Sequence, residues 1–225
     1  MNVIAIETSS SSGSVACGFE KTVMEEVFTK GMHHGRELII KIKELLEENE
    51  KTLEEINLIV VDVGPGSYTG LRIGVMTAKT LSFCKAIKLY PLSSLDILVQ
   101  NLVPAARCAC TLIDAKQGEV YFCLFEPQDY YWKRISEYQI LKPEEALKKI
   151  PRGASIIGDG ILKIEGLATR ADFDIISEND WRISARNALH LTARNFTPDK
   201  AIHPFELQPL YLRKSMAEVL WEKKR

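Results

Sequence analysis

The chain has 225 residues, of which 46% are hydrophobic and 26% charged. This composition is that of a globular protein and excludes disordered, collagen-like and coiled-coil chains. The length allows one large domain or two small ones. With 29 basic and 30 acidic residues the formal net charge is −1, so the chain lacks the basic surplus typical of a domain that binds nucleic acid unaided.

The cysteines and the lack of long apolar segments indicate the compartment. The 5 cysteines form no CxxC pair and have no histidine at zinc-site spacing, so we expect reduced thiols and no metal site. The sequence shows no secretory leader and no apolar run of about 20 residues, the length needed to span a bilayer. We therefore expect a cytoplasmic protein that does not enter a membrane.

The first hundred residues alternate strands with helices. Short apolar runs predict strands at residues 3–6, 14–19, 23–28, 58–63 and 87–90. Apolar residues at helical spacing predict helices at 34–49, at 71–85 and from residue 94. Because strands that alternate with helices form parallel or mixed sheets, this half of the chain predicts an α/β fold.

The second half begins as the first one does. Residues 108–113 and 119–125 predict two strands around a polar turn, as residues 4–19 do, which indicates a weak internal duplication. Further elements are expected as a β-segment at 132–140, a helix at 143–149, an apolar pair with a glycine turn at 156–160, and a helix at 184–196. Pro104 marks the boundary between two domains, residues 1–103 and 104–225, and we expect the last helix and the tail to pack back on the first domain.

A glycine-rich segment, GPGSYTGLRIG, occupies residues 64–74 at a strand-to-helix junction. Its spacing matches neither the Walker loop nor the Rossmann fingerprint. In the helix that follows, Gly70, Gly74, Ala78 and Ser82 recur every four residues, which places the smallest side chains along one face. A second helix can approach such a face closely, either within the chain or across a subunit interface.

Two polar turns follow apolar strands that end in an acid. Thr8 to Ser14 follow Glu7, and residues 115–118 follow Asp114. The amides and hydroxyls of these turns suit a phosphate, although turns favour the same residues without a ligand. Glu7 and Asp114 are placed either to orient magnesium or water in a nucleotide site or to accept hydrogen bonds from the turn that follows. Neither a GxSxG nucleophile motif nor an HExxH zinc motif occurs.

The glycine-rich segment resembles that of the TsaB (YeaZ) family of bacterial tRNA threonylcarbamoyladenosine biosynthesis proteins, in the actin-like ATPase superfamily. Further matches follow in family order along nearly the whole chain: IAIETS at 4–9, His34 with Glu37 and Leu38, PLSSLD at 91–96, IDAKQGEVY at 113–121, IIGDG at 156–160 and PLYLR at 209–213. The resemblance implies an α/β chain of two tandem actin-like (ribonuclease H-like) domains, with mixed sheets flanked by helices.

The resemblance also implies a non-catalytic role. In the catalytic relative TsaD an HxxxH pair holds a metal, and Ser94 and Leu98, which stand at the matching positions here, cannot serve as normal metal ligands. The implied function is scaffolding: the chain binds TsaD and, with it, TsaE. That complex transfers a threonylcarbamoyl group to N6 of adenosine 37 in tRNAs reading ANN codons, forming t6A. TsaC, which makes the threonylcarbamoyl adenylate, is a further expected partner, and tRNA is expected only as the substrate of the complex.

The resemblance places the partner interface on the helices of the first domain, and the same face is expected to form a homodimer when TsaD is absent. The expected interface residues are His34, Leu38, Gly70, Leu71, Arg72, Gly74, Thr77, Ala78 and Leu81. Vestigial nucleotide loops are expected at Glu7, Thr8, Ser9, Ser10, Asp114, Gly118, Gly158, Asp159 and Gly160. No cofactor is expected in the chain itself, and ATP or ADP is expected at the interface of the complex.

Many relatives have aspartate where this chain has Glu7, whose longer side chain would misplace a metal-bound water by about one bond length. This difference weakens the alternative function, an independent actin-like ATPase or small-molecule kinase that uses Glu7 and Asp114 with Mg²⁺. A third hypothesis is direct tRNA contact through Arg213, Lys214 and the basic residues 223–225, against which the near-zero net charge argues.

Overall fold

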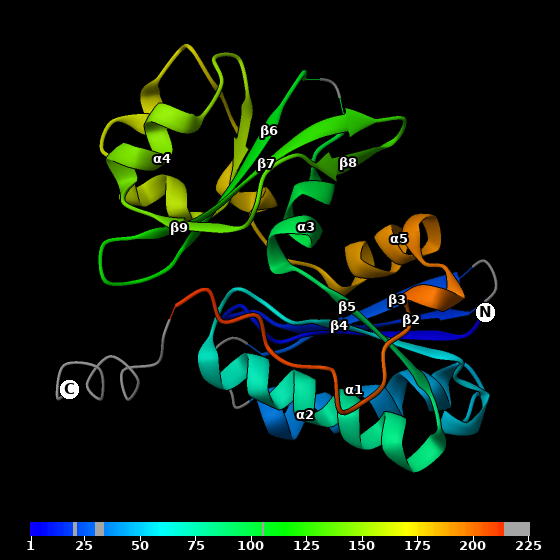
Figure 1. The fold of residues 1–225 in the computed structure, drawn as a ribbon. Coiled ribbons are helices and arrows are strands. Elements are labelled where there is room, and N and C mark those ends of the chain that lie inside the picture. The colour runs from blue at the N-terminus through cyan, green and yellow to red at the C-terminus, as the bar shows by residue number, and fades with distance from the viewer. Residues whose placement is uncertain (20–21, 30–33, 105, 214–225) are drawn as a thin grey trace, which may run out of the picture.

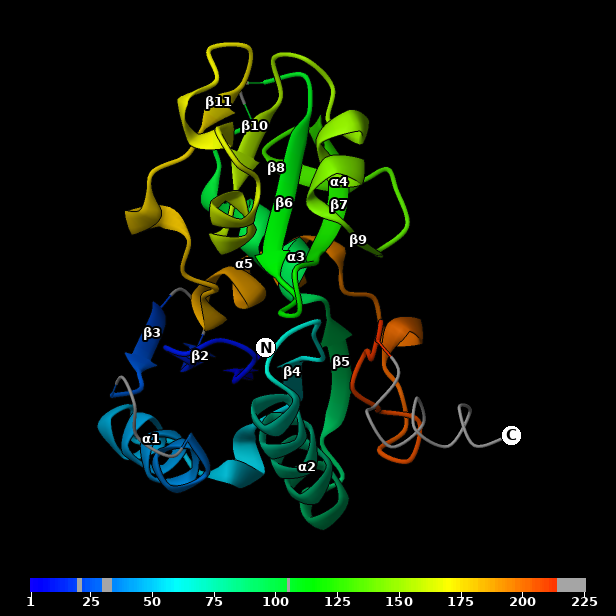
Figure 2. The same cartoon turned by 90° about the vertical axis from the view of Figure 1, so that its left-hand side faces the viewer.

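The computed structural model describes residues 1–19, 22–29, 34–104 and 106–213. It is an α/β structure with two mixed β-sheets, one from each half of the chain, and with helices packed on both (Figure 1). The two sheets lie on either side of α3 and α5, and α1 and α2 form a layer beyond the first sheet (Figure 2). Lys214 and residues 223–225, considered above for tRNA contact, lie outside the described residues.

The first sheet has the strand order β3-β2-β1-β4-β5. Its strands are β1 Val3–Glu7, β2 Ser14–Phe19, β3 Thr22–Val27, β4 Leu58–Asp62 and β5 Lys88–Leu92. The strands β1, β2 and β3 form an antiparallel meander, whereas β4 lies parallel to β1 and β5 parallel to β4. Helix α1 (His34–Glu48) connects β3 with β4, and α2 (Tyr68–Lys85) makes the crossover that the parallel pair β4–β5 requires.

Helices cover both faces of this sheet, because successive residues of a buried strand point to opposite sides. Ile4 and Ile6 of β1 are buried in the core beneath α1 and α2. Val3 and Ala5 point the other way, into the core that contains α5 (Ala185–Asn195). The first sheet is therefore the central layer between one pair of helices and a helix supplied by the second half of the chain.

The second sheet has the order β11-β10-β6-β7-β8, with β9 paired to another part of β7. Its elements are β6 Ala109–Asp114, β7 Val120–Gln128, β8 Tyr131–Arg134, β9 Gln139–Leu141, α4 Pro143–Lys149, β10 Ser155–Ile157 and β11 Asp174–Ile175. The β6–β7 hairpin, which pairs Asp114 with Val120, corresponds to the β1–β2 hairpin, which pairs Glu7 with Ser14. The hairpin repetition that the sequence indicates is therefore present in the fold.

The connections between the halves are short helices and extended chain. Helix α3 (Ser94–Leu98) leads from the first sheet to the second, and 3₁₀ helices occur at Leu53–Glu55, Val99–Asn101, Asp159–Lys163, Leu167–Thr169, Glu178–Asp180 and Pro198–Lys200. After α5 the chain runs along the first sheet, where Ile202 bridges to Leu89 and the Leu210 amide donates to the Val63 carbonyl at 2.7 Å. Across the described residues, every helix is too short or too polar to span a bilayer.

Among the predicted elements whose bounds differ from the structure, two differ for a clear physical reason. The β-segment expected at 132–140 is two strands, β8 and β9, because Phe125–Gln128 and Val120–Phe122 of the long strand β7 pair with different partners. Helix α2 starts at Tyr68 rather than at residue 71, because the Ser67 hydroxyl accepts a hydrogen bond from the Gly70 amide and caps the helix there.

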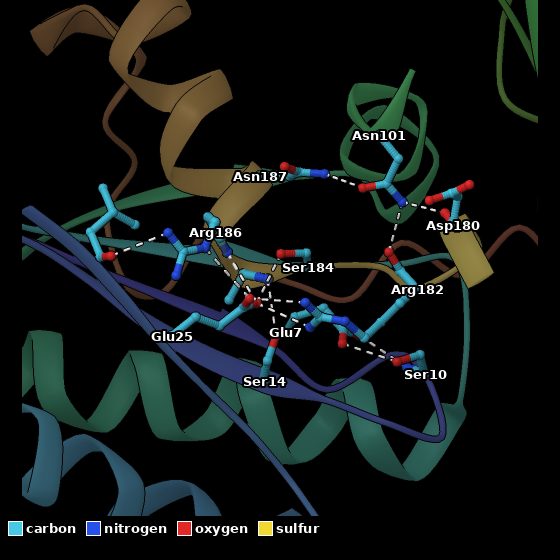
Figure 3. Close-up of polar contacts among 12 residues, drawn as sticks. Glu7, Ser10, Ser14, Glu25, Asn101, Asp180, Arg182, Ser184, Arg186 and Asn187 are labelled. Atoms are coloured by element: carbon cyan, nitrogen blue, oxygen red, sulfur yellow. Dashed lines mark hydrogen bonds and ion pairs between the residues drawn. The ribbon is translucent and has the colours of Figure 1, made fainter. Parts of the chain in front are cut away.

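A buried ion pair attaches α5 to the first sheet. Glu25 of β3 accepts two hydrogen bonds from the Arg182 guanidinium, at 3.2 and 2.9 Å, and one from the Ser184 hydroxyl at 2.8 Å (Figure 3). Its side chain is 6% exposed. Burial alone would raise the pKa of Glu25, but the hydrogen bonds and charge of Arg182 outweigh it and lower that pKa to about 2. The segment that begins α5 is thus fixed by one carboxylate of the first half.

The substitution Glu25→Gln should lower the free energy of unfolding by about 2 to 3 kcal/mol at neutral pH, because it leaves Arg182 half-buried without its partner charge. In the wild type this contribution is present above the ordinary glutamate pKa of 4.5 and is lost as the pH falls toward about 2, since the folded-state pKa is lowered. Urea unfolding at several pH values measures both effects.

The matched control is Glu47→Gln, which removes one carboxylate of the exposed pair Lys43–Glu47 on α1. Exposed pairs contribute about 0.5 kcal/mol or less, so this variant should unfold almost as the wild type does. Equal effects of the two substitutions would contradict the role assigned to Glu25.

Candidate functional site

A cleft of about 620 Å³ lies between the loops of the two sheets. Four segments form its walls: residues 9–12 after β1, residues 65–67 after β4, the end of β6, and the segment before α5. The last two contribute Ile113, Asp114, Lys116, Glu178, Trp181, Arg182 and Ile183, and Leu98, Asp159 and Leu162 complete the lining. Because β1 and β4 are parallel, their carboxyl ends meet at one edge of the sheet, which is where open α/β sheets bind ligands.

The structure brings four of the predicted loop residues to this cleft, namely Ser9, Ser10, Asp114 and Asp159. Glu7 and Thr8 are fully buried beneath it. The turn after β1 and the turn after β6 thus line the same cleft, as expected for two matched loops. Glu7 does not line it, because its side chain is fully buried.

The three glycines predicted in the nucleotide loops have structural roles. A Cβ on Gly158 would lie 2.1 Å from the Leu112 carbonyl oxygen, and one on Gly160 would lie 2.8 Å from the Leu112 carbonyl carbon. Both glycines are needed where the chain crosses β6 at close range. Gly118 lies at the exposed turn of the β6–β7 hairpin with a φ of +79°. These packing contacts and the positive φ explain the glycines without a ligand, and their assignment to a nucleotide loop stays a prediction.

Glu7 is enclosed by the turn that follows it. One carboxylate oxygen accepts hydrogen bonds from the amides of Ser9 (2.6 Å) and Ser10 (3.0 Å) and from the Ser9 hydroxyl (2.7 Å). The other oxygen accepts one from the Ser10 hydroxyl at 3.0 Å. Glu7 therefore organises the loop at the cleft wall, in agreement with the turn-binding alternative that the sequence left open.

A second carboxylate, Asp62 at the end of β4, lies next to Glu7 and is also fully buried. The Ser9 hydroxyl oxygen is 2.7 Å from Glu7 and 2.8 Å from Asp62, so it bridges the two carboxylates. Asp62 also accepts hydrogen bonds from the Gly64 amide (2.8 Å) and from the Ser94 hydroxyl (2.6 Å). Because Ser94 begins α3, this pair joins the first sheet to the helix that leads into the second.

Hydrogen counting places one proton on the pair. The Ser9 hydroxyl carries one hydrogen, so it can donate to one carboxylate and must accept from the other. Burial raises the pKa of Glu7 as well, but hydrogen bonds from Ser9 and Ser10 oppose that rise. The Oδ2 of Asp62 faces only the hydroxyl oxygens of Ser9 and Ser94, so we assign the shared proton to Asp62. Burial, followed by the charge of Glu7, raises the pKa of Asp62 to about 7.

Asp114 has different surroundings from Glu7. Its carboxylate accepts hydrogen bonds from the amide and the ammonium of Lys116, at 2.8 and 2.7 Å, and lies 3.3 Å from Lys163. Partial burial would raise its pKa, but these contacts outweigh burial and hold the pKa of Asp114 below its ordinary value. The two acids that the sequence paired therefore do not form one Mg²⁺ site: Asp114 lines the cleft and Glu7 does not.

The small-residue face of α2 packs inside the chain. A Cβ on Gly70 would lie 1.9 Å from the Thr8 carbonyl oxygen, and one on Gly74 would lie 2.3 Å from the Thr8 Oγ1. The Thr8 hydroxyl itself donates to the Gly70 carbonyl at 2.8 Å, and Ala78 is fully buried further along the same face. Glycine is required at both positions because the end of β1 lies against the helix backbone. The small-residue face therefore makes a contact within the chain, one of the two possibilities that the sequence left open.

The predicted partner interface is therefore wrong for the residues that are buried in this chain. They are Leu38, Gly70, Leu71, Gly74 and Ala78. Arg72 is exposed, and Thr77 and Leu81 are half-buried at the helix surface. The side chain of His34 lies outside the described residues. Arg72 stacks over the Tyr68 ring, and its Nε donates to the Tyr211 hydroxyl at 3.1 Å, so the helix start also holds the last described segment.

Sequence reasoning missed Asp62 and Ser94, although the signal for Asp62 was present. It ends an apolar strand at a polar loop, the same pattern that selected Glu7 and Asp114. Asp62 lies next to Glu7 because β1 pairs with β4, about fifty residues further along the chain. No local sequence pattern predicts this pairing. Ser94 was considered as the counterpart of a metal ligand, whereas the structure shows it as a hydrogen-bond donor to Asp62.

Comparisons with known proteins agree with this fold. A family model, TsaD: tRNA N6-adenosine threonylcarbamoyltransferase, matches residues 22–193. The tRNA threonylcarbamoyladenosine biosynthesis proteins TsaB of Haemophilus influenzae and Escherichia coli are each 26% identical to this chain. The alignments cover 99% of this chain and 97% and 98% of those proteins.

Solved structures provide a second comparison. YeaZ from Pseudomonas aeruginosa has a TM-score of 0.82 and 22% identity, over 93% of this chain and 100% of that one. A Pseudomonas aeruginosa protein described as similar to peptidase YEAZ has a TM-score of 0.84 and 23% identity, over 94% of this chain and 99% of that one. At these identities the likeness concerns the fold.

The proton count predicts how the pair affects stability. Because Asp62 keeps its proton up to a pKa of about 7 in the folded chain but loses it near 3.8 when unfolded, stability should fall as the pH rises between these values. One proton gives a slope of about 1.4 kcal/mol per pH unit. Asp62→Asn should remove this slope, since its amide can donate to Ser9 as the protonated acid does. Urea unfolding at a series of pH values measures the slope.

Glu7→Gln is the matched comparison. It should destabilise the chain throughout this pH range, because its amide group would face donors of Ser9 and Ser10. If Glu7→Gln were tolerated and Asp62→Asn were not, the assignment of the proton to Asp62 would be wrong.

The close contact between β1 and α2 predicts the effect of a single methyl group. Gly70→Ala should lower the free energy of unfolding by about 1 to 3 kcal/mol, because the chain must shift to relieve the clash with Thr8. Gly35→Ala on α1, whose Cβ would find Ile73 at 3.7 Å, should be neutral or stabilising. Thermal unfolding of both variants measures this difference, and a neutral Gly70→Ala would contradict the packing.

Proposed function

We infer the function of this chain from its family: it belongs to the TsaD family of tRNA N6-adenosine threonylcarbamoyltransferases, in the TsaB (YeaZ) branch, with the actin-like fold. The chain takes part in the biosynthesis of threonylcarbamoyladenosine (t6A) in tRNA. Within that role, we propose that it is a non-catalytic scaffold or activating subunit. It would bind TsaD and, with TsaD, TsaE, in the complex that modifies adenosine 37 of tRNAs reading ANN codons.

The enclosure of Glu7 is the observation that best supports a non-catalytic role. A carboxylate that orients Mg²⁺ or water must present a lone pair to the cleft, whereas both oxygens of Glu7 accept hydrogen bonds from its own loop. The positions matched to the metal-binding histidines of TsaD support the same role. The Ser94 hydroxyl donates a hydrogen bond to Asp62, and Leu98 is buried in the core.

The cleft also fits a nucleotide phosphate poorly. Asp114, Asp159 and Glu178 line it together with two basic residues, Lys116 and Arg182. Lys116 is paired with Asp114, and Arg182 is paired with Glu25. A triphosphate would therefore meet carboxylates without free cations to offset them. We accordingly propose that ATP or ADP, where the complex requires it, binds at the contact with a partner subunit rather than in this cleft.

The exposed sides of α1 and α2 are the proposed partner surface. Large hydrophobic side chains are exposed along both helices, at Ile39, Ile40, Tyr68, Met76 and Phe83. The two helices lie side by side on the outer face of the first sheet, and Gly35 of α1 sits against Ile73 of α2 (Figure 2). A paired-helix surface of this kind suits helix-to-helix docking. It replaces the buried small-residue face that the sequence suggested.

The same surface gives the remaining partner proposals. In the absence of TsaD, two copies of this chain would cover their apolar helices as a homodimer. TsaC would supply the threonylcarbamoyl adenylate to the complex, and tRNA would be its substrate. The chain would act in the cytoplasm, together with these proteins and tRNA.

A reconstituted modification assay tests the proposed function. Unmodified tRNA would be incubated with TsaC, TsaD, TsaE, ATP, threonine and bicarbonate, with and without this chain. We expect t6A formation to depend on the chain, and we expect the chain alone neither to hydrolyse ATP nor to modify tRNA. Modification that continues unchanged without the chain would refute the proposal, and ATP turnover by the chain alone would favour the independent ATPase or kinase.

Two exposed residues test the partner surface in the same assay. Ile39 and Met76 are 50% and 57% exposed, so Ile39→Lys with Met76→Lys should leave thermal unfolding unchanged. We expect the double variant to weaken TsaD binding by at least tenfold and to reduce t6A formation accordingly, because two charges would be buried in the contact.

Ile135→Lys is the control for this experiment, since Ile135 is a 49% exposed hydrophobic residue in the second half of the chain. It should bind TsaD as the wild type does. If the double variant bound TsaD with unchanged affinity, the surface on α1 and α2 would not be the partner interface.

A further inference from the structure

Helix α5 presents a row of basic side chains on the side that does not pack on the first sheet. Arg186, His190 and Arg194 follow one another at intervals of four residues and are all exposed. At this spacing, side chains project from the same side of a helix. The opposite side, which includes Ala188 and Leu189, is buried in the core, so the row faces away from the sheet.

The row borders a groove of about 330 Å³ between α5 and the β7–β8 turn. The described lining residues are Gln100, Asn101, Leu102, Val103, Pro104, Tyr130, Asn187, His190 and Arg194, none of which carries a carboxylate. The Tyr130 side chain, at the turn, is 84% exposed. The groove therefore combines an accessible aromatic ring with cationic and amide side chains.

The contacts around the groove leave its positive charge largely uncompensated. Arg186 is partly offset by Glu25, 3.8 Å away. Arg194 instead donates to the Tyr130 backbone carbonyl at 2.6 Å, and no ion pair of Arg194 is recorded within the described part of the chain. Partial burial and then the charges of Arg186 and Arg194 lower the pKa of His190, as expected where positive charges exceed negative ones.

Polar groups in the groove could also contact a base. Asn187 donates its Nδ2 hydrogen to Asn101, and in the described residues its Oδ1 has no partner (Figure 3). An exposed aromatic ring, a free amide oxygen and the guanidinium of Arg194 together fit an unpaired nucleotide, in which the base stacks and the phosphate is neutralised. An acidic peptide would use the cations but would gain nothing from the ring.

The position of the groove is compatible with the partner surface. Helix α5 packs on the face of the first sheet opposite to α1 and α2. A protein bound to the outer helices would therefore leave the α5 groove open (Figures 1 and 2). The cleft between the sheets does not compete as an RNA site, because Asp114, Asp159 and Glu178 line it.

We propose that the groove between α5 and the β7–β8 turn binds an unpaired segment of the tRNA substrate, with a base stacked on Tyr130 and a phosphate neutralised by Arg194. This assignment rests on the proposed role in tRNA modification, and it gives the chain a direct contact with RNA in addition to its partner contact. It differs from contact through the basic C-terminal residues, because the cations involved belong to a folded helix.

The experiment is a titration of fluorescent unmodified tRNA with the reconstituted complex of full-length chain and TsaD, at about 50 and 200 mM salt. Arg194→Gln removes the charge but keeps a polar side chain at this position. It should weaken binding several-fold at low salt and reduce the salt slope, log affinity against log salt, by about 0.7, the value for one phosphate on a single strand. Tyr130→Ala should weaken binding by about tenfold through lost stacking and leave the slope unchanged.

Two controls match these changes elsewhere on the surface. Lys148→Gln removes an exposed charge on α4, and Phe205→Ala removes an aromatic ring that is 71% exposed. Both should bind tRNA as the wild type does. The proposal is overturned if Arg194→Gln and Tyr130→Ala bind tRNA with wild-type affinity and slope, or if they lose affinity for a protein subunit instead. Failure of the wild-type complex to need this chain for t6A formation would refute the proposed function separately.

Discussion

The buried contact between Glu7 and Asp62 is the constraint on which the centre of this structure depends. Two carboxylates can be buried side by side only if one is protonated and the remaining oxygens accept hydrogen bonds. The chain meets this condition with the Ser9 bridge, the amides of the turn after β1, and the Ser94 hydroxyl from α3. The same contact therefore shapes the cleft wall, encloses the carboxylate of Glu7, and fixes the helix that leads to the second sheet.

The first sheet separates the two proposed binding surfaces because its strands are buried on both faces. The outer helices α1 and α2 expose hydrophobic residues that suit a protein partner, and the inner helix α5 exposes basic residues that suit RNA. The ion pair between Glu25 and Arg182 holds α5 in place across the chain. The proposed partner surface and the proposed RNA groove therefore lie on opposite faces of the first sheet, so both could be occupied at once.

The sequence predicted most helices and strands because their apolar periodicity is local. The α4 helix was predicted at its observed bounds, and the hairpins at β1–β2 and β6–β7 were visible as a repeated pattern. The partner surface was predicted on the small-residue face of α2, which the structure buries within the chain. A line of small residues predicts close packing but does not say whether the neighbour belongs to the same chain or to a partner. Here the neighbour is Thr8 of the same chain.

The sequence by itself determined the α/β class, the family and the acids that end the strands, because these depend on short motifs and on local periodicity. Only the tertiary structure decided that Glu7 meets Asp62, that Asp114 does not join them, and that His190 and Arg194 line one groove with Tyr130. These facts depend on which strands pair and on how far each side chain is removed from water. Neither property is encoded in the neighbours of a residue along the chain, since both arise from contacts made across many tens of residues.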